Sequence, residues 1–531
     1  MGVHGAFLHS LKQMYAHVGM RVRVDGRLGK LFRADVGVKQ GDPLSPLLFG
    51  LFIDRIEQFL AERCTSAGAG RLGGLLLQAL LYADDLVLLA ESAEELQEML
   101  DCLHEFAMAN HMTVNIDKSK VVVFNNTHKW AGSMLYAGSA LPIVPHFVYL
   151  GTRFYSSCNK LGHVRKNMSS NLVKAKAAMN AMKQRCRELG VHNVMVQSDL
   201  FNVLVASILN FGSEVWSVYH MEDLSSTTVA WGSGGEAERL HRIFLRSVFQ
   251  VRTRTSGAPL LNEARRSPIM HSWFKLSVGW WNRIVARSDD DLVKQALREN
   301  IQELAFGGLG VGQLQQPPKS CWGSAFFSML NSVNPIMEAS LKVYSLSKIP
   351  ITATMNRIHN LWHTRVWGHW ATVPVNSAPL RSIPDAETNG FKLATYRSWF
   401  CSGSLERGEG FAYHVNTLAQ IKALATFRMS SHDLNIELMR HAPNRRPRQF
   451  RLCRCCDAGA REDEMHVLDC EAYRDIRATY ADVFDVPHDP NPDAFMLHVM
   501  NPGHDARAWS RLANLLINIM ARRKSILDSL A

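Results

Sequence analysis

Two adjacent carboxylates, Asp84 and Asp85, lie between two apolar runs in the segment LLYADDLVLLA (residues 80–90). The flanking residues favour β-strands, so this segment predicts a hairpin with the two aspartates at its turn. Divalent Mg²⁺ and Mn²⁺ prefer hard oxygen ligands, and two such ions about 4 Å apart can hold the attacking and leaving oxygens of a phosphoryl transfer. The pair therefore predicts a metal site. A polar hairpin turn without a metal would also explain it, because Asp is common in turns.

A second cluster combines thiols and an imidazole: Cys453 and Cys456 are spaced as C-x2-C, and His466 and Cys470 follow as H-x3-C. Two thiolates from a tight knuckle and a His/Cys pair on one helical turn suit tetrahedral Zn²⁺. Cys455 is spare, or could compete with Cys456 for the site. A cysteine-rich loop followed by an ordinary helix is the alternative. Five nearby arginines would supply phosphate contacts: Arg445, Arg446, Arg448, Arg451 and Arg454.

Helices and strands are mixed over the first part of the chain. An Asp-Gly pair at 25–26 predicts a hairpin turn, and Ser92 with Glu95 predicts a capping box that opens a helix. The segments KVVVFNN (120–126) and FVYLGTRF (147–154) each predict one strand. These elements would surround the aspartate hairpin and fix its position.

A Gly-Asp-Pro turn leads into an apolar helix in GVKQGDPLSPLLFGLFID (37–54). Such a turn lets the backbone around Gly41 and Asp42 approach a ligand closely. A helix N-terminus followed by a core helix is the alternative interpretation of the same residues.

Four of these segments, VKQGDPLSPLLF, YADD, VNIDKSK and FVYLG, occur in the order and spacing of a known family. Together they closely resemble the palm motifs of the reverse transcriptases of non-LTR (LINE-like) retrotransposons. The resemblance covers about residues 1–220. It implies RNA-directed DNA polymerase activity on an RNA template and a DNA primer, with dNTPs as substrates.

The resemblance also implies a role for each matching segment. Asp84 and Asp85 would be the catalytic residues that hold Mg²⁺ or Mn²⁺. The loop and helix from Gln40 to Phe49 would pack on the templating base and the incoming nucleotide, and a lysine of VNIDKSK would donate a proton or contact a phosphate. Contacts to nucleotide and primer are thus expected at Gln40, Gly41, Asp42, Ser45, Lys118, Lys120, Tyr149, Leu150 and Gly151, the last three at the turn that grips the primer.

The basic helices that follow, from about 165 to 190, look like a thumb that holds the template–primer backbone. A solvated charged face is the alternative. The basic residues are Arg165, Lys166, Lys174, Lys176, Lys183, Arg185 and Arg187.

Polymerase palms use three carboxylates, and in this family the third precedes the segment that resembles GVHGAFLHSLKQMYAHV (2–18). That segment stands at the start of this sequence, so we expect an N-terminal truncation that lacks the fingers region and the first palm aspartate. Asp54 is expected on the surface of its helix, and Asp35 lies on the wrong side for the hairpin, so neither replaces it. The chain by itself is expected to polymerise poorly or not at all.

The stretch that ends in RLCRCC (451–456) and the following EDEMHVLDCEAYRDIR (462–477) resemble the C-terminal zinc-knuckle region of the same retrotransposons. In the family, the spacing between the His and the last Cys is usually one residue longer than that between His466 and Cys470 here.

The fold class expected is α+β: a partial polymerase palm with an antiparallel hairpin and helices, a helical thumb, and a mostly helical C-terminal half with a small zinc knuckle. The expected domains are 1–157 (partial palm), 158–225 (thumb-like), 226–435 (helical linker region of unknown role) and 436–531 (basic zinc-knuckle region). Aromatic residues mostly fill interiors, so the tryptophans of the third region are expected to pack in a core rather than to stack on bases.

The 531-residue chain has a formal net charge of +11 and a pI near 9.2. This charge favours nucleic acid as partner and an anionic membrane surface second. No uninterrupted apolar run reaches the roughly 18 residues of a membrane span, and scattered cysteines fit reduced thiols inside a cell, in the nucleus or cytoplasm. The leading interpretation is a reverse transcriptase segment. The alternative is a non-catalytic nucleic-acid-binding remnant that uses the thumb and the zinc knuckle.

Overall fold

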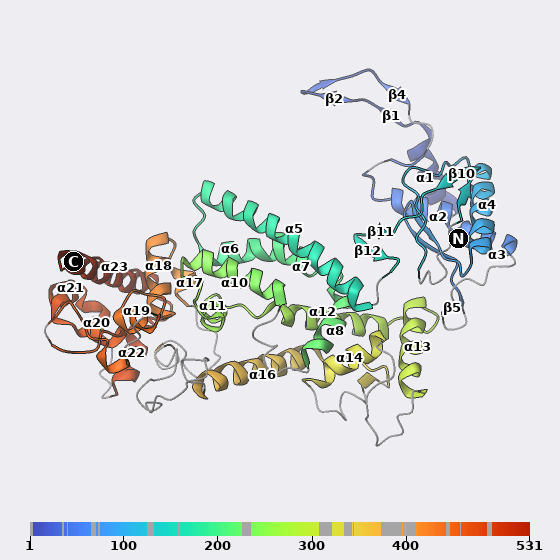
Figure 1. Cartoon of the computed structure of the whole chain (residues 1–531). Coiled ribbons are helices and arrows are strands. Elements are labelled where there is room, and N and C mark those ends of the chain that lie inside the picture. The colour runs from blue at the N-terminus through green and yellow to red at the C-terminus, as the bar shows by residue number, and fades with distance from the viewer. Residues whose placement is uncertain are drawn as a thin grey trace. The chain divides into compact units, whose positions relative to one another are not determined.

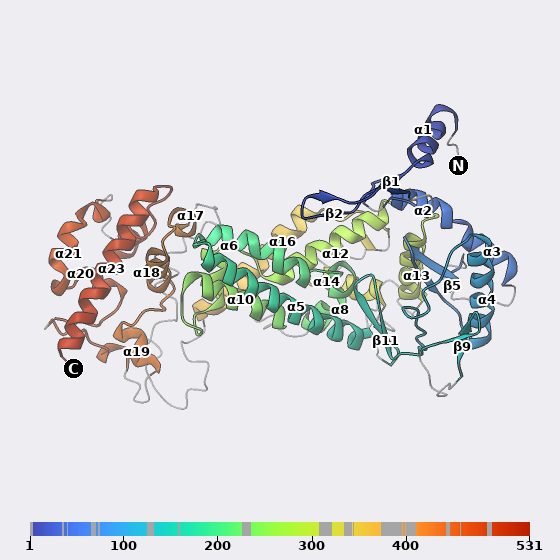
Figure 2. The same ribbon diagram turned by 90° about the horizontal axis from the view of Figure 1, so that it is seen from above.

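A computed structural model gives the three-dimensional structure of the chain (Figure 1 and Figure 2). It describes residues 4–33, 37–39, 41–64, 71–72, 75–124, 132–157, 160–225, 235–306, 321–333, 342–343, 345–372, 396, 399, 410–441, 447–456, 458–485 and 491–530. The chain divides into two compact units, Met1–Ser157 and Cys158–Ala531.

The first unit combines helices with short antiparallel strand pairs. Its helices are α1 (Gly5–Ala16), α2 (Ser45–Ile53), α3 (Arg55–Arg63) and α4 (Ala93–Ala109). Its strand pairs are β1 (Gly19–Met20) with β4 (Phe32–Arg33), β2 (Arg23–Val24) with β3 (Arg27–Leu28), β5 (Arg71–Leu72) with β6 (Leu75–Leu76), β7 (Ala79–Tyr82) with β8 (Asp85–Leu88), β9 (Met134–Tyr136) with β10 (Ser139–Leu141), and β11 (His146–Tyr149) with β12 (Thr152–Tyr155).

Helix α4 supplies much of the core of the first unit. The predicted capping box begins it: the Ser92 hydroxyl accepts a hydrogen bond from the Glu95 N–H, and the Glu95 carboxylate accepts from the Ser92 N–H. This arrangement satisfies N–H groups that the first helical turn leaves without intrahelical partners. The buried face of α4 packs on α3, where the rings of Phe59 and Phe106 meet edge to face with centroids 5.3 Å apart.

The sequence predicted one of the tight hairpin turns of the first unit and missed another. At the predicted Asp-Gly turn, Asp25 and Gly26 have φ of +48° and +80°, as a two-residue hairpin with a type I′ turn requires. The segment FVYLGTRF, predicted as one strand, is instead two strands, because Leu150 and Gly151 turn the chain with φ of +47° and +80°. The strand predicted over 120–126 is also wrong for 120–124, where only Val121 pairs, in a single bridge.

The second unit is helical. Its helices are α5 (Lys160–Glu188), α6 (Val194–Phe201), a π-helix (Asn202–Ala206), α7 (Ser207–Leu209), α8 (Ser213–Ser225), α10 (Gly235–Phe249), α11 (Gly257–Glu263), α12 (Ile269–Val285), α13 (Leu292–Phe306), α14 (Trp322–Asn331), α16 (Ile351–Thr372), α17 (Phe411–His414), α18 (Leu418–Arg428), α19 (Asn435–His441), α20 (Glu464–Asp469), α21 (Arg474–Thr479), α22 (Pro492–Val499) and α23 (Ala506–Ser529), with 3₁₀ turns at Arg448–Phe450, Glu471–Tyr473 and Ala481–Phe484. Helices together with small antiparallel hairpins confirm the α+β class.

One contiguous apolar core runs through the second unit, from Ala175 on α5 to Ile519 on α23. Trp273, Trp281 and Trp362 are buried in it, which confirms core packing for these three tryptophans. The side chains of Trp367 and Trp370 lie outside the described residues.

Among the described helices, none is by itself long and apolar enough to cross a membrane. Val194–Leu209 and Ser213–Met221 reach that length and composition only as a pair, and they are bent by 77° at the break between them.

We expect the stability of the second unit to fall below pH 6.5 because of His271, a buried residue of α12. Burial, and then the nearby His359, lower the pKa of His271 from its ordinary value of 6.5 to about 4. The unfolded chain takes up a proton there below about pH 6.5 and the folded chain does not, so stability is present above pH 6.5 and is lost as the pH falls toward 4, by up to about 3 kcal/mol.

Urea unfolding at pH 7 and pH 5, followed by tryptophan fluorescence, measures this loss. His271→Leu should reduce the difference between the two pH values, whereas His498→Leu, which replaces an exposed histidine of the same unit, should leave it unchanged. An equal pH dependence in all three proteins would contradict the assignment to His271.

Candidate functional site

The two sequence-predicted catalytic aspartates lie at the end of the β7–β8 hairpin. Tyr82 pairs with Asp85 in the register, so Ala83 and Asp84 form a two-residue turn, and Ala83 adopts a φ of +51°. Both aspartates are exposed, while the strands behind them pack on the core of the unit through Leu81, Leu86 and Leu88. The charges therefore avoid the cost of burial, and the apolar flanks serve to anchor the turn.

The β11–β12 hairpin lies close to these carboxylates. Burial, and then the negative charge of Asp85, raise the pKa of Tyr149 above its ordinary value. Tyr149 ends β11 opposite Thr152, and Leu150 and Gly151 form the turn between them. The structure thus brings together Asp85 and Tyr149, two predicted site residues that are far apart in the sequence.

The loop before α2 is held by its own side chains. The Asp42 carboxylate accepts a hydrogen bond from the Leu44 N–H at 2.9 Å and from the Tyr15 hydroxyl at 3.2 Å. The buried Ser45 hydroxyl donates to the Lys39 carbonyl at 2.5 Å, and Gly41 has a φ of +84°. Asp42 and Ser45 therefore shape this loop. Gln40, also predicted to contact the nucleotide, lies outside the described residues.

The VNIDKSK segment forms a tight turn, with the Asn115 side chain accepting a hydrogen bond from the Lys118 N–H at 3.1 Å. The turn leaves Lys118 exposed, while the Lys120 ammonium donates to the Asp117 carbonyl at 2.6 Å. Of the two lysines, Lys118 is the one whose ammonium makes no hydrogen bond or ion pair with a described residue.

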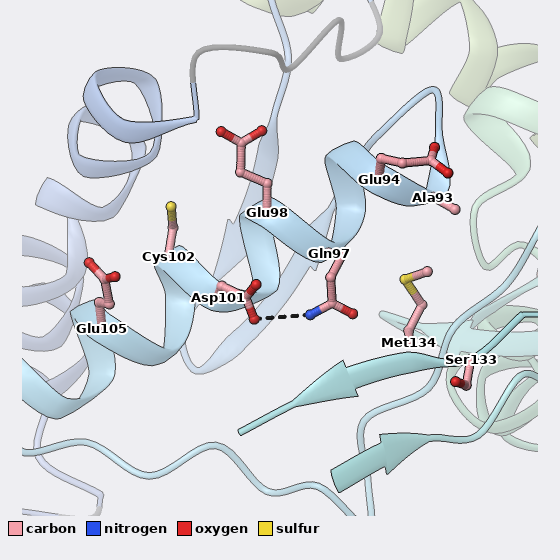
Figure 3. Close-up of a pocket in the computed structure, with 9 residues that line it drawn as sticks. All are labelled: Ala93, Glu94, Gln97, Glu98, Asp101, Cys102, Glu105, Ser133 and Met134. Carbon is pink, nitrogen blue, oxygen red and sulfur yellow. Dashed lines mark hydrogen bonds between the residues drawn. The ribbon is translucent and has the colours of Figure 1, made fainter. Parts of the chain in front are cut away.

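An open groove on α4 lies apart from the predicted site residues (Figure 3). The Gln97 side chain donates to the Leu135 carbonyl at 2.8 Å and accepts from the Leu135 N–H at 2.9 Å. These two bonds occupy backbone groups on the outer edge of β9. Four of its side chains are acidic, so its charge is wrong for a nucleotide phosphate. The lining residues are Ala93, Glu94, Gln97, Glu98, Asp101, Cys102, Glu105, Ser133 and Met134.

The basic residues predicted for the thumb lie on α5. The opposite face of the helix is buried, with Ala175, Met179, Met182 and Cys186 in the core. Lys183 is half-buried, and burial followed by the charge of Arg187 lowers its pKa. The others are exposed: Arg165, Lys166, Lys174, Lys176, Arg185 and Arg187.

In the second unit, the four predicted zinc ligands come together. One ligand atom from each of Cys453, Cys456, His466 and Cys470 lies within 4.8 Å of all the others, and 3.4 Å separates Cys456 Sγ from His466 Nε2. Ligand atoms 2.0–2.3 Å from a shared zinc ion would be separated by about 3.3–3.8 Å. The ligand atoms are therefore almost as close together as they would be around a bound zinc ion. Three thiols and one imidazole form a donor set that zinc prefers.

Burial governs the thiol chemistry of this cluster. It raises the pKa of Cys453, opposed by the Cys455 N–H and reinforced by nearby Cys470, and it raises the pKa of Cys470 as well. Burial therefore favours the neutral form of these two thiols.

Cys455 lies next to the four-ligand cluster but is not one of its members. It lies close to Tyr473, whose pKa is raised by burial and then by Cys455. It could form an alternative three-ligand group with Cys453 and Glu462, but the Glu462 carboxylate is already occupied. The geometry therefore favours Cys456 over Cys455 as the ligand.

Three consecutive buried acidic residues, Glu462, Asp463 and Glu464, fix the cysteine cluster in the unit, and the sequence analysis did not single them out. The Glu462 carboxylate accepts two hydrogen bonds from Arg523 on α23, at 2.7 and 2.8 Å, and a third from the Asn435 N–H at 2.6 Å. These partners join the cluster to α19 and α23.

The two other acids have separate partners. Asp463 caps α20 by accepting from the His466 N–H at 3.1 Å, which orients a predicted ligand. Burial alone would raise the pKa of Glu464, but His432, 3.0 Å away, lowers it to about 2. The position of Asp463, three residues before His466, is a helix N-cap signal that the sequence does contain.

Comparison with known proteins identifies the first unit. Residues 4–154 match the family model described as reverse transcriptase (RNA-dependent DNA polymerase). This segment is similar to the reverse transcriptase family. The prediction of a non-LTR reverse transcriptase segment, made from the motifs, is confirmed for this part of the chain.

Three relatives of the reverse transcriptase segment come from insect mobile elements. The Pol polyprotein from retrotransposable element R2DM of Drosophila melanogaster is 32% identical over 180 residues, which cover 32% of this chain and 16% of that protein. The R2 polyprotein of Nasonia vitripennis is 43% identical over 88 residues, or 16% and 8% of the two chains. The RNA-directed DNA polymerase from mobile element jockey of Drosophila funebris is 25% identical over 203 residues, or 37% and 21%.

The buried ion pair between Glu462 and Arg523 generates a stability prediction for the second unit. Arg523→Met should lower the free energy of unfolding by about 3–5 kcal/mol, because it leaves a buried carboxylate without its countercharge. The double variant Glu462→Met/Arg523→Met should recover part of this loss. Urea unfolding followed by tryptophan fluorescence measures all three proteins.

The neighbouring arginine provides a matched control. Arg522 pairs with Asp475 on the surface, with side chains 44% and 64% exposed, so Arg522→Met should cost only about 0–1 kcal/mol. Equal losses for Arg522→Met and Arg523→Met would show that the buried pair has no special role.

Proposed function

We propose that the chain acts in RNA-directed DNA synthesis, with Asp84 and Asp85 as the metal-binding carboxylates. The observation that carries the proposal is the exposed aspartate turn with Tyr149 beside it, in a segment of the reverse transcriptase family. The matched parts span only 16%, 8% and 21% of the three relatives, so activity, substrates and partners are proposed for this chain.

The proposed site fits a divalent cation such as Mg²⁺ or Mn²⁺. Asp84 and Asp85 offer hard oxygen ligands at a two-residue turn, and neither forms an ion pair with another described residue. When bound, the metal would lower the pKa of the primer 3′ hydroxyl and neutralise charge on the phosphates. The primer 3′ oxygen would then attack the α-phosphorus of a dNTP, and pyrophosphate would leave.

The remaining predicted residues would position the substrates of this reaction. Lys118 presents an exposed ammonium for a triphosphate, and the turn of Tyr149, Leu150 and Gly151 would hold the primer end near Asp85. The exposed basic side chains of α5 would contact the template–primer backbone, which makes binding dependent on salt.

The chain by itself is expected to polymerise weakly, and Asp84→Asn should reduce its incorporation of labelled dNTP on an RNA template by about 100-fold or more, because one ligand of the ions that stabilise transition-state charge is lost. Asp101→Asn, which neutralises an exposed carboxylate on α4, should leave incorporation unchanged. Electron paramagnetic resonance of Mn²⁺ gives a readout that does not need turnover: Asp84→Asn should bind less Mn²⁺ than Asp101→Asn.

Equal Mn²⁺ binding and equal incorporation in the two variants would refute the assignment. Salt-dependent RNA binding without incorporation, unaffected by Asp84→Asn, would instead support the non-catalytic nucleic-acid-binding alternative.

We also propose a structural zinc site formed by Cys453, Cys456, His466 and Cys470. Its support is the convergence of the four ligand atoms within 4.8 Å and the occupation of Glu462 by Arg523. Bound zinc would stabilise the fold around α19, α20 and α23, since structural zinc contributes directly to folding.

Two adjacent cysteines allow a matched test of the zinc ligands. Cys456→Ser should lower the zinc content measured by mass spectrometry well below one ion per chain and lower the unfolding temperature. Cys455→Ser should retain the metal, because Cys455 is not among the four ligand atoms that converge. Loss of zinc in Cys455→Ser but not in Cys456→Ser would make Cys455 the ligand in place of Cys456. Absence of zinc from the unaltered chain and from both variants would refute the site.

A further inference from the structure

A two-stranded ribbon spans residues 19–33, built from β1–β4 at its base and β2–β3 at its tip, and it extends away from the helices of the first unit (Figure 1). We call it the basic ribbon. Every residue from 21 to 33 is exposed, including Val22 at 58%, Leu28 at 62% and Leu31 at 61%. A two-stranded ribbon that buries nothing is only marginally stable in water by itself.

The basic ribbon carries a strong positive charge. It contains five cationic residues and one acidic residue, Asp25, which gives a net charge of +4 (five minus one). Among the described residues, none of Arg21, Arg23 and Lys30 has an acidic partner. Arg33 lies close to His17, with 3.4 Å between Nη2 and Nδ1. The cations are Arg21, Arg23, Arg27, Lys30 and Arg33.

Strand geometry divides these side chains between two faces. Successive residues of an extended strand point to opposite sides, and paired residues share a side. Along the first strand, Arg21 and Arg23 therefore lie on one side, about 7 Å apart, and Met20, Val22 and Val24 lie on the other. This alternation gives the ribbon a cationic side and a mostly apolar side.

The second strand adds to both sides. Arg33 pairs with Gly19, which places it on the side of Arg21 and Arg23, whereas Phe32 pairs with Met20 on the apolar side. The register changes between the two strand pairs, with the Gly29 N–H donating to the Val22 carbonyl at 2.8 Å. In the other strand pair, Arg27 pairs with Val24 on the apolar side and Leu28 pairs with Arg23 on the cationic side. The cationic side therefore carries Arg21 and Arg23 from the first strand and Arg33 from the second.

We propose that the cationic side of the basic ribbon binds the phosphate backbone of a nucleic-acid duplex. The cationic side presents arginines from both strands of the ribbon, and the two strands of a duplex present phosphates on either side of a groove. The near absence of acidic residues opposes a basic protein partner, and unpaired arginines spaced two residues apart fit successive phosphates. This inference deepens the proposed function and rests on it.

The test is binding of a labelled RNA–DNA hybrid duplex by fluorescence anisotropy across a salt series. Arg21→Gln/Arg23→Gln/Lys30→Gln should weaken binding and reduce the slope of log K against log [salt] by about 3, because each lost phosphate contact reduces it by about 1. Circular dichroism and the unfolding temperature should match those of the unaltered chain, since these side chains make no buried contacts.

Two control variants show whether the effect on duplex binding is specific. One removes positive charge outside the ribbon, and the other changes only the apolar side of the ribbon. Lys12→Gln/Arg55→Gln removes exposed cations of the same unit outside the ribbon and should leave the slope unchanged. Val22→Thr/Val24→Thr keeps the charge and the preference for strands and should leave duplex binding unchanged. An unaltered slope in the triple variant, or a larger loss in Val22→Thr/Val24→Thr, would overturn the proposal.

A single-stranded RNA of the same length tests whether the ribbon prefers a duplex. An equal loss of affinity for both ligands in the triple variant would overturn that preference. The assay needs no catalysis, so its failure is distinct from failure of the polymerase assignment. Loss of incorporation in Asp84→Asn with a normal slope in the triple variant would retain the enzyme and reject the basic ribbon. A chain that binds no duplex at all would reject the basic ribbon outright.

Discussion

The two-residue turn at Ala83 and Asp84 is the constraint on which the candidate catalytic site depends. The turn closes only because Tyr82 and Asp85 pair across it, and this pairing presents both carboxylates at the exposed end of the hairpin. The apolar residues behind the turn pack on the core that α3 and α4 build, so the charged end is held by a rigid base. The apolar residues of the segment therefore hold the turn in place, and the turn keeps the two charges in water.

Helix α5 follows the same principle: a buried apolar face holds exposed charged side chains in place. Its buried face joins the core of the second unit, and its basic side chains remain in water. The basic ribbon is an exception, because it has no buried face. Exposed apolar and cationic side chains alternate along it, which is why an external ligand is the natural explanation for its charge.

The cysteine cluster follows a different rule, since its surroundings are polar and buried. Glu462, Asp463 and Glu464 are each satisfied by a different partner, on α23, on α20 and at His432. Buried charges persist only when paired and hydrogen-bonded, so the three acids fix the direction in which the loop enters the ligand cluster. The predicted zinc ligands are thus positioned by contacts that lie outside the ligand set.

The sequence alone determined the features that depend on local chemistry. The capping box at Ser92, the Asp-Gly turn, the aspartate hairpin and the family of the first unit could all be predicted, because each depends on residues close together in the chain. The ligand spacing also predicted that Cys453, His466 and Cys470 would meet with either Cys455 or Cys456, since a knuckle and one helical turn fix their approach.

Only the tertiary structure decided the rest. Nothing local relates Tyr149 to Asp85 or Glu462 to Arg523, which are 61 residues apart, because long-range pairs are selected by the packing of whole elements. The turn at Leu150 was missed for a related reason: a leucine at positive φ is unfavourable by itself and is held there by strand pairing on both sides. The choice of Cys456 over Cys455 likewise follows from the buried neighbours of each thiol, which the spacing of the residues cannot specify.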